Sequence, residues 1–304
     1  MAGNRHAYRY DEALGCRLQD NLRLLRTTDY QEEIYTNQLG TANFQKDFAD
    51  YQTLVLVVGD SFTQGTGLPM DASYPFQLDL LLNMQNDHYV KKYAVVNLGV
   101  ATYGGKQNLI TLKKYCEKLG KPAYVLYLGC NNDYEDDLLL ESGRVHKRMV
   151  AGNPNWPWYT NPLIWWAHET ELGKRVKIAL GNLKKRRIFS QDRALSQSPD
   201  KQKGAAELEE PIFQELSKLT RQVGAKLIVS WANLPSEQDS SYTWLKEFAR
   251  QHQIAFADWY PAVQSVQTAI QAIPLDNPHS GGHHRTWVNR QIAQAYARHI
   301  LSPE

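Results

Sequence analysis

One stretch of the chain decides the fold: TLVLVV at residues 53–58, closed by Gly59. It is a continuous run of β-branched and aliphatic residues, which is typical of a strand that is buried on both faces. Two similar runs follow it, YAVVNL at 93–98 and AYVLYL at 123–128. Strands of this kind occur in parallel sheets that helices cover on both sides, so the stretch indicates an α/β protein.

Helical patterns alternate with these runs. Lys106–Leu119, for example, has apolar residues spaced three or four apart, and Gly120 and then Pro122 follow it. The other expected elements are the helices Tyr74–Met84, Pro211–Val223, Tyr242–Gln251 and Arg285–Ile300 and the strands Lys226–Trp231 and Ile254–Trp259. This alternation predicts a three-layer α/β/α sandwich around a doubly wound, parallel five-stranded sheet. Ligands of such sheets bind beyond the carboxyl ends of the strands.

Two segments stand outside the alternation. Residues 1–50 are polar and weakly periodic, and we expect an extension packed on the core, with short helices as one option. The main domain then covers 51–304, with a Trp-rich, basic insertion at about 138–205 whose last part, Gln197–Gly204, reads as a flexible loop. The insertion offers either an aromatic wall for sugars or a membrane-surface contact, or it covers the core. Its tryptophans are Trp156, Trp158, Trp165 and Trp166.

Composition excludes several classes of protein. The chain has 304 residues, of which 42% are hydrophobic and 22% charged, unlike a disordered, collagen-like or coiled-coil chain. A net charge of +2 gives no strong overall attraction to nucleic acid, and no nucleic-acid partner is expected. Three cysteines without a CxxC pair argue against a disulfide scaffold or structural zinc. Because no signal peptide or long apolar run is evident, we expect a cytoplasmic protein.

Ser61 is the first candidate for chemistry. It follows the first strand in the sequence Gly59-Asp60-Ser61, where this architecture places catalytic groups. A serine at this point is also a common helix N-cap, so the residue alone does not establish a nucleophile. A catalytic serine needs a histidine base and an acid that orients the base.

A cluster after the last strand supplies both groups. Asp276 stands three residues before His279 on a proline-containing loop, so its carboxylate can reach the imidazole Nδ1. The other ring nitrogen can then take a proton from Ser61. The rival interpretation is a metal site made by Asp276, His279, His283 and His284. We expect no metal or other cofactor, and we assign His283 to shaping the loop.

Acyl transfer also needs donors for the developing oxyanion. The third strand is followed by Gly129-Cys130-Asn131-Asn132-Asp133, which places asparagine amides at the same sheet edge. The second strand is followed by the glycine-rich loop Asn97–Gly105, whose backbone N–H groups are further donors. Each stretch alone is also an ordinary polar turn.

Together the four loops resemble the four sequence blocks of the SGNH (GDSL-type) hydrolases, over about residues 52–301. The matching segments are Gly59–Ser61, Asn97–Gly105, Gly129–Asp133 and Asp276–His279. The resemblance implies the flavodoxin-like SGNH hydrolase fold, with Ser61 as nucleophile, His279 as base and Asp276 as orienting acid. It also implies an oxyanion hole from the Ser61 amide, a second-block amide and a third-block asparagine.

The chain departs from the family pattern in two blocks. Thr102 stands where close relatives have the donor glycine, and a β-branched residue resists a positive φ. Either Thr102 donates from an ordinary conformation, or Gly104 takes over the role. The third block has an extra asparagine, for which we prefer Asn132 over Asn131 as the donor. Two further candidates, for substrate binding, are Trp231, the last residue of the fourth predicted strand, and Asn233, which follows it.

The expected function is a serine esterase acting on a small acyl, lipid-like or O-acetylated carbohydrate ester. An O-acetyltransferase to a sugar hydroxyl shares the same acyl-enzyme, and NQLG at 37–40 and NDYEDD at 132–137 resemble SGNH domains near polysaccharide-modification systems. A catalytically inactive carbohydrate-binding module is the option from another class. The partners are then an ester substrate and, through the insertion, a membrane surface. The oligomeric state stays open.

Overall fold

The structure is a computed structural model, and it describes most of the chain outside the insertion. The described residues are 7–27, 31–45, 47–84, 92–147, 150, 153, 170, 172–173, 175–176, 199–234, 240–270, 273–278, 280 and 282–302. The four insertion tryptophans lie outside this set, as do Lys174, Lys177 and Lys184–Arg187 of its basic run, so the roles expected for them stay predictions. In the described parts, no helix combines the length and apolarity that crossing a bilayer requires.

Five parallel strands form the central sheet, in the order β6-β5-β7-β8-β9. The strands are β5 (Thr53–Gly59), β6 (Tyr93–Asn97), β7 (Tyr124–Gly129), β8 (Lys226–Trp231) and β9 (Ala255–Phe256). Because β5 lies between β6 and β7, the chain after β5 emerges close to the switch point of the sheet, where ligands of such folds bind. Of the fifth predicted strand, only Ala255–Phe256 is regular, at the edge of the sheet.

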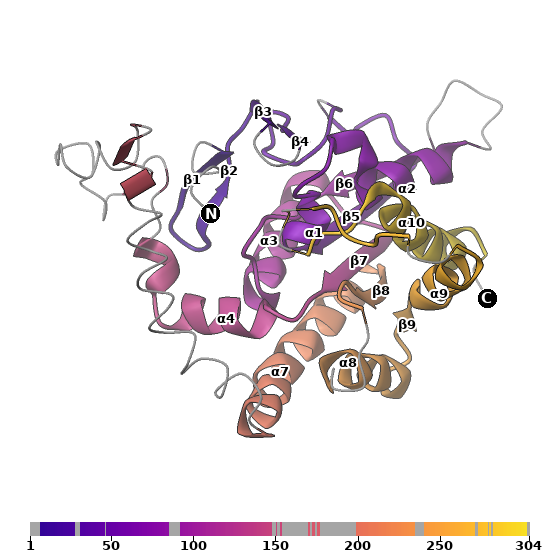
Figure 1. The fold of residues 1–304 in the computed structure, drawn as a ribbon. Coiled ribbons are helices and arrows are strands. Elements are labelled where there is room, and N and C mark those ends of the chain that lie inside the picture. The colour runs from indigo at the N-terminus through magenta and orange to yellow at the C-terminus, as the bar shows by residue number, and fades with distance from the viewer. Residues whose placement is uncertain are drawn as a thin grey trace.

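Helices cover both faces of the sheet (Figure 1), which confirms the predicted three-layer α/β/α fold. Val55 and Val57 face one apolar core, while Leu56 and Val58 face the other, as the period of two along a strand requires. The first core is closed by α2 (Tyr74–Asn83), α9 (Tyr260–Ala269) and α10 (Thr286–Leu301). The second is closed by α3 (Gly105–Leu119), α7 (Pro199–Val223) and α8 (Ser240–Gln251).

The structure corrects three details of the helix assignment. The helix α7 begins at Pro199, so the flexible loop predicted for Gln197–Gly204 is wrong from residue 199 onward. The predicted helix Pro211–Val223 therefore begins too late, because Pro211 lies inside α7. The helices α4 (Asp133–Glu141) and α9 were not predicted.

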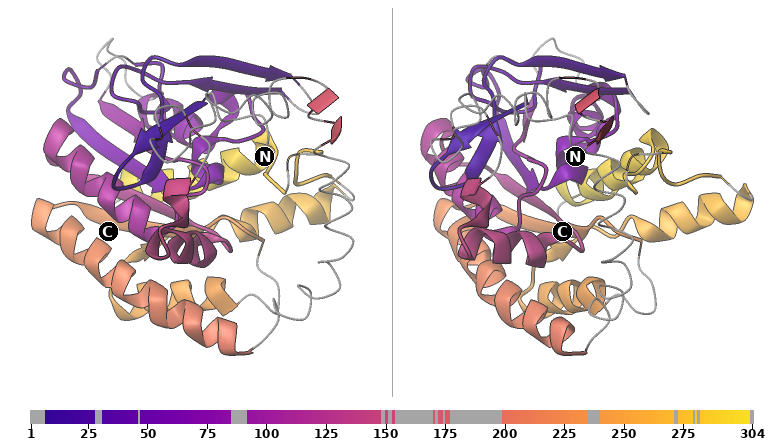
Figure 2. Two further views of the ribbon diagram at one scale, coloured as in Figure 1. Left: turned by 90° about the vertical axis from the view of Figure 1, so that its left-hand side faces the viewer. Right: turned by 60° about the vertical axis from the view of Figure 1, so that its left-hand side comes forward.

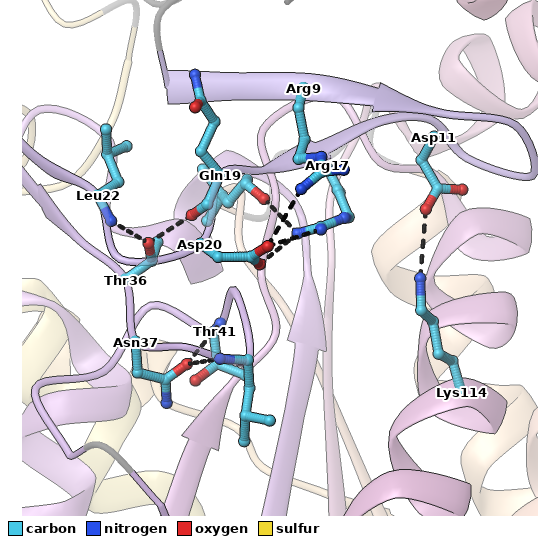
Figure 3. Close-up of polar contacts among 12 residues, drawn as sticks. Arg9, Asp11, Arg17, Gln19, Asp20, Leu22, Thr36, Asn37, Thr41 and Lys114 are labelled. Carbon is cyan, nitrogen blue, oxygen red and sulfur yellow. Dashed lines mark hydrogen bonds and ion pairs between the residues drawn. The ribbon is translucent and has the colours of Figure 1, made fainter. Parts of the chain in front are cut away.

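The extension begins with two β-hairpins where short helices were one option (Figure 2). The hairpins are β1–β2 (Tyr8–Asp11, Gly15–Leu18) and β3–β4 (Arg23–Thr27, Gln31–Tyr35). Polar contacts hold the first one in place: Arg17 donates two hydrogen bonds to Asp20, and the Lys114 ammonium of α3 lies 3.3 Å from the Asp11 carboxylate (Figure 3). The hairpin is therefore connected to the helix that follows the second-block loop.

That loop, residues 98–104, lies directly on the short helix α1 (Ser61–Gln64). The Val100 N–H donates to the Gly59 carbonyl at 3.2 Å, at the carboxyl end of β5. A Cβ on Gly99 would lie 2.5 Å from the Gln64 nitrogen and 2.6 Å from the Thr63 carbonyl carbon. Only glycine therefore allows the loop to approach α1 this closely.

A pair of buried carboxyl groups lies where α3, α4 and α7 meet. The Asp137 carboxylate accepts a hydrogen bond from the Lys106 N–H in the first turn of α3 at 2.9 Å, and it is also hydrogen-bonded to Glu209 of α7. Burial, and next the nearby Asp133 and Asp137, raise the pKa of Glu209 to about 9. Glu209 is therefore protonated at neutral pH and donates to Asp137, which caps α3.

We predict that Gly99→Ala destabilises the protein by about 3 kcal/mol, because its methyl group meets backbone atoms that cannot move aside. Gly120→Ala is the control, since Gly120 has open space around it but a φ of +89°. Its cost is strain alone, about 1–2 kcal/mol. Urea unfolding measures both, and a Gly99 variant no less stable than the Gly120 variant would contradict the close approach.

A second prediction concerns pH. Between pH values near 4.5 and 9 the folded protein keeps the Glu209 proton that the unfolded chain has lost, so the free energy of unfolding falls as pH rises. Glu209→Gln removes this titrating group. We therefore expect the free energy of unfolding of the variant to fall less steeply with pH than that of the wild type, by up to about 1.4 kcal/mol per pH unit. Thermal unfolding from pH 5 to 9 tests this, with the exposed Glu210→Gln as control. Parallel curves for wild type and Glu209→Gln would refute it.

Candidate active site

Ser61 is the first residue of α1, directly after the carboxyl end of β5. The preceding residue, Asp60, is fully buried and caps the helix, since its Oδ1 accepts the Phe62 N–H at 2.9 Å. The other oxygen, Oδ2, lies 3.0 Å from the Ser61 hydroxyl. A Cβ on Gly59 would approach the Leu128 carbonyl oxygen to 2.9 Å, so glycine is needed for the chain to pass β7 before it reaches Ser61.

The imidazole of His283 contacts Ser61. Its Nε2 lies 2.8 Å from the Ser61 Oγ, and its Nδ1 contacts the backbone carbonyl of Ser280. Because a carbonyl only accepts, Nδ1 carries the proton and Nε2 is free to accept the Ser61 proton. The ring also packs against Phe62, with centroids 4.9 Å apart. The hydroxyl of Ser61 thus has a base within hydrogen-bond distance and with the required tautomer.

Among the described residues, Asp276, the predicted orienting acid, contacts His284. Its Oδ1 lies 2.7 Å from Nδ1 of His284, whose Nε2 lies 2.7 Å from the Ala232 carbonyl. The His284 ring is buried between Phe62 and Trp259, with centroid distances of 5.2 and 5.4 Å. The Asp276–His284 pair therefore attaches the loop before α10 to the end of β8.

His279, the predicted base, lies outside the described residues, so its role stays a prediction. His283 was expected only to shape the loop, and the structure differs because its ring reaches Ser61. Asp-x-x-His spacing favoured His279. The feature of the sequence that could have pointed to His283 is the adjacent pair His283-His284, because the side chains of neighbouring residues point in different directions. Here the His283 ring contacts Ser61, and the His284 ring contacts Asp276.

The second block places Thr102 in an unusual backbone conformation. Its φ is +76°, which for a β-branched residue stores about 1–3 kcal/mol of strain. The expectation that Thr102 keeps an ordinary conformation is therefore wrong. The alternative donor, Gly104, has an extended backbone, and its N–H donates to Oε1 of Gln107 at 3.2 Å in the first turn of α3. That N–H is engaged, which argues against Gly104 as the donor.

The third block brings its asparagines to the same sheet edge. The Asn132 side chain donates to Asp136 at 2.7 Å and its Oδ1 lies 2.9 Å from the Cys130 Sγ, so its orientation is set and a second amide hydrogen remains on Nδ2. The Asn131 N–H donates to the side chain of Asn233 at 2.8 Å, which connects the ends of β7 and β8. Both Asn131 and Asn132 are exposed.

The two residues predicted for substrate binding differ in position. Asn233 is half-buried at the edge of the site, where it contacts the third block. Trp231 is only 6% exposed and packs against Gly129, so it supports the site from inside the core.

One group among the described residues has the geometry to hold a metal ion: Asp60, Cys130 and Asp133, all buried beneath Ser61. Burial, and next the Asp133 and Asp60 charges, raise the pKa of the Cys130 thiol well above its ordinary value. Burial, and next the charge of Asp60, also raise the pKa of Asp133. The thiol therefore keeps its proton, and it donates to Asp60 at 3.0 Å. This chemistry fits a hydrogen-bonded floor of the site better than a set of metal ligands.

Comparison with known proteins gives matches among solved structures only. No protein-family model and no curated protein matches the chain. It is similar to the structure described as TesA, with 16% identity and a TM-score of 0.46 over 82% of this chain and 99% of that one. A putative lipolytic protein of the G-D-S-L family from Desulfitobacterium hafniense DCB-2 gives 13% identity and 0.46, over 81% and 98% of the two chains. The acetyl xylan esterase AlAXEase gives 13% and 0.44, over 80% and 97%. Proteins of the G-D-S-L family, whose motifs the sequence resembles, are thus among the solved structures that align with most of this chain.

Proposed function

We propose that the protein is a serine hydrolase that cleaves carboxylic esters through an acyl-enzyme on Ser61. The observation that carries the proposal is the 2.8 Å contact between the Ser61 Oγ and Nε2 of His283. It pairs a hydroxyl with a base at the carboxyl end of a parallel sheet, which is where the catalytic groups of such folds lie.

In the proposed mechanism, Ser61 attacks the ester carbonyl while its proton passes to Nε2 of His283. The Nδ1–H bond to the Ser280 carbonyl keeps the ring oriented and stabilises the imidazolium. The same proton then goes to the leaving alcohol. Water, activated by His283, hydrolyses the acyl-enzyme and restores the free hydroxyl.

Three donors are proposed for the tetrahedral oxyanion: the backbone N–H groups of Ser61 and Thr102 and the side-chain amide of Asn132. Each comes from a loop that follows a different neighbouring strand, so the three converge on one edge of the sheet. A single donor of this kind contributes about 3–4 kcal/mol to transition-state stabilisation.

The substrate class proposed is an ester with a small acyl, lipid-like or O-acetylated carbohydrate portion. A panel of p-nitrophenyl esters of increasing chain length, assayed with and without sugar acceptors, separates these classes. Transfer of the acyl group to a sugar in preference to water would replace the esterase by an acyltransferase that uses the same acyl-enzyme.

We predict that Ser61→Ala lowers the turnover of p-nitrophenyl acetate by at least about 10³-fold, because the nucleophile is removed. The control is Ser265→Ala, an exposed serine on α9. Thermal unfolding should show both variants folded. Turnover by Ser61→Ala close to that of wild type would end the proposal.

The base is tested by comparing His283→Ala with His279→Ala. If His283 is the base, its variant should lose about 10²–10⁴-fold in kcat, and His279→Ala should lose less than about tenfold. The reverse order would restore the triad expected from the sequence, with His279 oriented by Asp276. Asp276→Asn should have a smaller effect than His283→Ala, since the Asp276 carboxylate contacts His284.

A further inference from the structure

The loop 98–104 is held on one side by Gln64, the last residue of α1. The Gln64 Oε1 accepts two hydrogen bonds, from the Ala101 N–H at 2.8 Å and from the Tyr8 hydroxyl of β1 at 3.0 Å. Gln64 is 8% exposed, so both bonds are shielded from water. One side chain thus connects the helix that carries Ser61, the residue before Thr102, and the N-terminal hairpin.

The hairpin β1–β2 holds the other side of the same loop. The Tyr103 hydroxyl donates to the Cys16 carbonyl at 2.8 Å, and Gln107 donates to the Leu14 carbonyl at 2.7 Å. An apolar cluster joins the two segments, in which Val100 and Tyr103 are buried together with residues of the hairpin. The hairpin members of this cluster include Tyr8, Leu14, Cys16 and Leu18. The residues on both sides of Thr102 are therefore fixed by contacts that originate in the extension.

Thr102 needs such support because its φ of +76° is unfavourable for a β-branched residue. A strained conformation persists only where its surroundings over-determine it. A loop released from Tyr8 and Gln64 would relax toward a negative φ, which would turn the N–H groups of the loop away from their present directions. The hairpin therefore affects the backbone conformation of Thr102 at the sheet edge as well as the packing of the loop.

We infer that the hairpin β1–β2, acting with Gln64, is a clamp that keeps Thr102 in the conformation of an oxyanion donor. Tyr8, Gln64 and Tyr103 are its positioning residues. This inference rests on the proposed function, in which the Thr102 N–H binds the oxyanion. The clamp would make the extension a requirement for turnover, although the Ser61 hydroxyl itself contacts Asp60 and His283.

The test uses Tyr8→Phe, which removes one hydroxyl and leaves the ring. We expect kcat for p-nitrophenyl acetate to fall about tenfold with KM nearly unchanged, because misplacing a donor weakens the transition state more than the ground state. Gln64→Met, which removes both hydrogen bonds to Gln64, should act in the same direction. The control on the same hairpin is Arg9→Gln, which breaks only an exposed ion pair with Asp20 and should leave kcat unchanged.

A double-mutant cycle separates positioning from a purely structural role. Glycine accepts a positive φ without strain, so in a Thr102→Gly background the loss caused by Tyr8→Phe should shrink to less than about threefold. An equal loss in both backgrounds, or a Tyr8→Phe variant with a lower melting temperature and normal kcat, would overturn the clamp. Ser61→Ala is assayed in parallel. If Ser61→Ala is inactive and the effects of Tyr8→Phe and Thr102→Gly are additive, the clamp is refuted while the proposed function stands. If Ser61→Ala is fully active, the proposed function itself is refuted.

Discussion

The buried carboxylate of Asp60 accepts hydrogen bonds from the Phe62 backbone and from the thiol of Cys130, which directly follows the neighbouring strand β7, and its Oδ2 lies 3.0 Å from the Ser61 hydroxyl. A buried charge requires such partners, because without them its desolvation would not be offset. These contacts begin α1, place the Ser61 hydroxyl between Asp60 and His283, and hold the end of β7 against the end of β5. The positions of the candidate nucleophile and of the third block both follow from this one carboxylate.

The strands could be predicted because burial on both faces leaves an unbroken apolar run, as in β5 and β7. The short strand β9 and the helix α9 have no such pattern. Their secondary structure depends on contacts with elements that are distant in the sequence. A proline inside a helix is unfavourable, so the sequence did not indicate that α7 continues on both sides of Pro211. The hairpins of the extension are short and half-exposed, so their periodicity is weak.

The sequence was sufficient to predict which loops form the candidate site, since parallel strands bring their carboxyl ends to one edge of the sheet. The choice of side chains within each loop could not be predicted in this way. Thr102, Gly104, Asn131 and Asn132 differ in which hydrogen bonds they already make, and only the fold shows that the Gly104 N–H is bound by Gln107. Likewise, the partners of His283 and His284 depend on how the loop turns after Asp276, where spacing alone allows several pairings.

The three cysteines lie in different parts of this arrangement. Cys16 is buried in the hairpin, Cys130 is buried beneath Ser61, and Cys116 is partly exposed on α3. A thiol reagent added to the native protein therefore meets Cys116 first, while Cys16 reacts only when the hairpin separates from the core and Cys130 only when the floor of the site opens. The rates at which the two buried thiols are alkylated would thus measure, without any engineered probe, how often each of these two regions opens on its own.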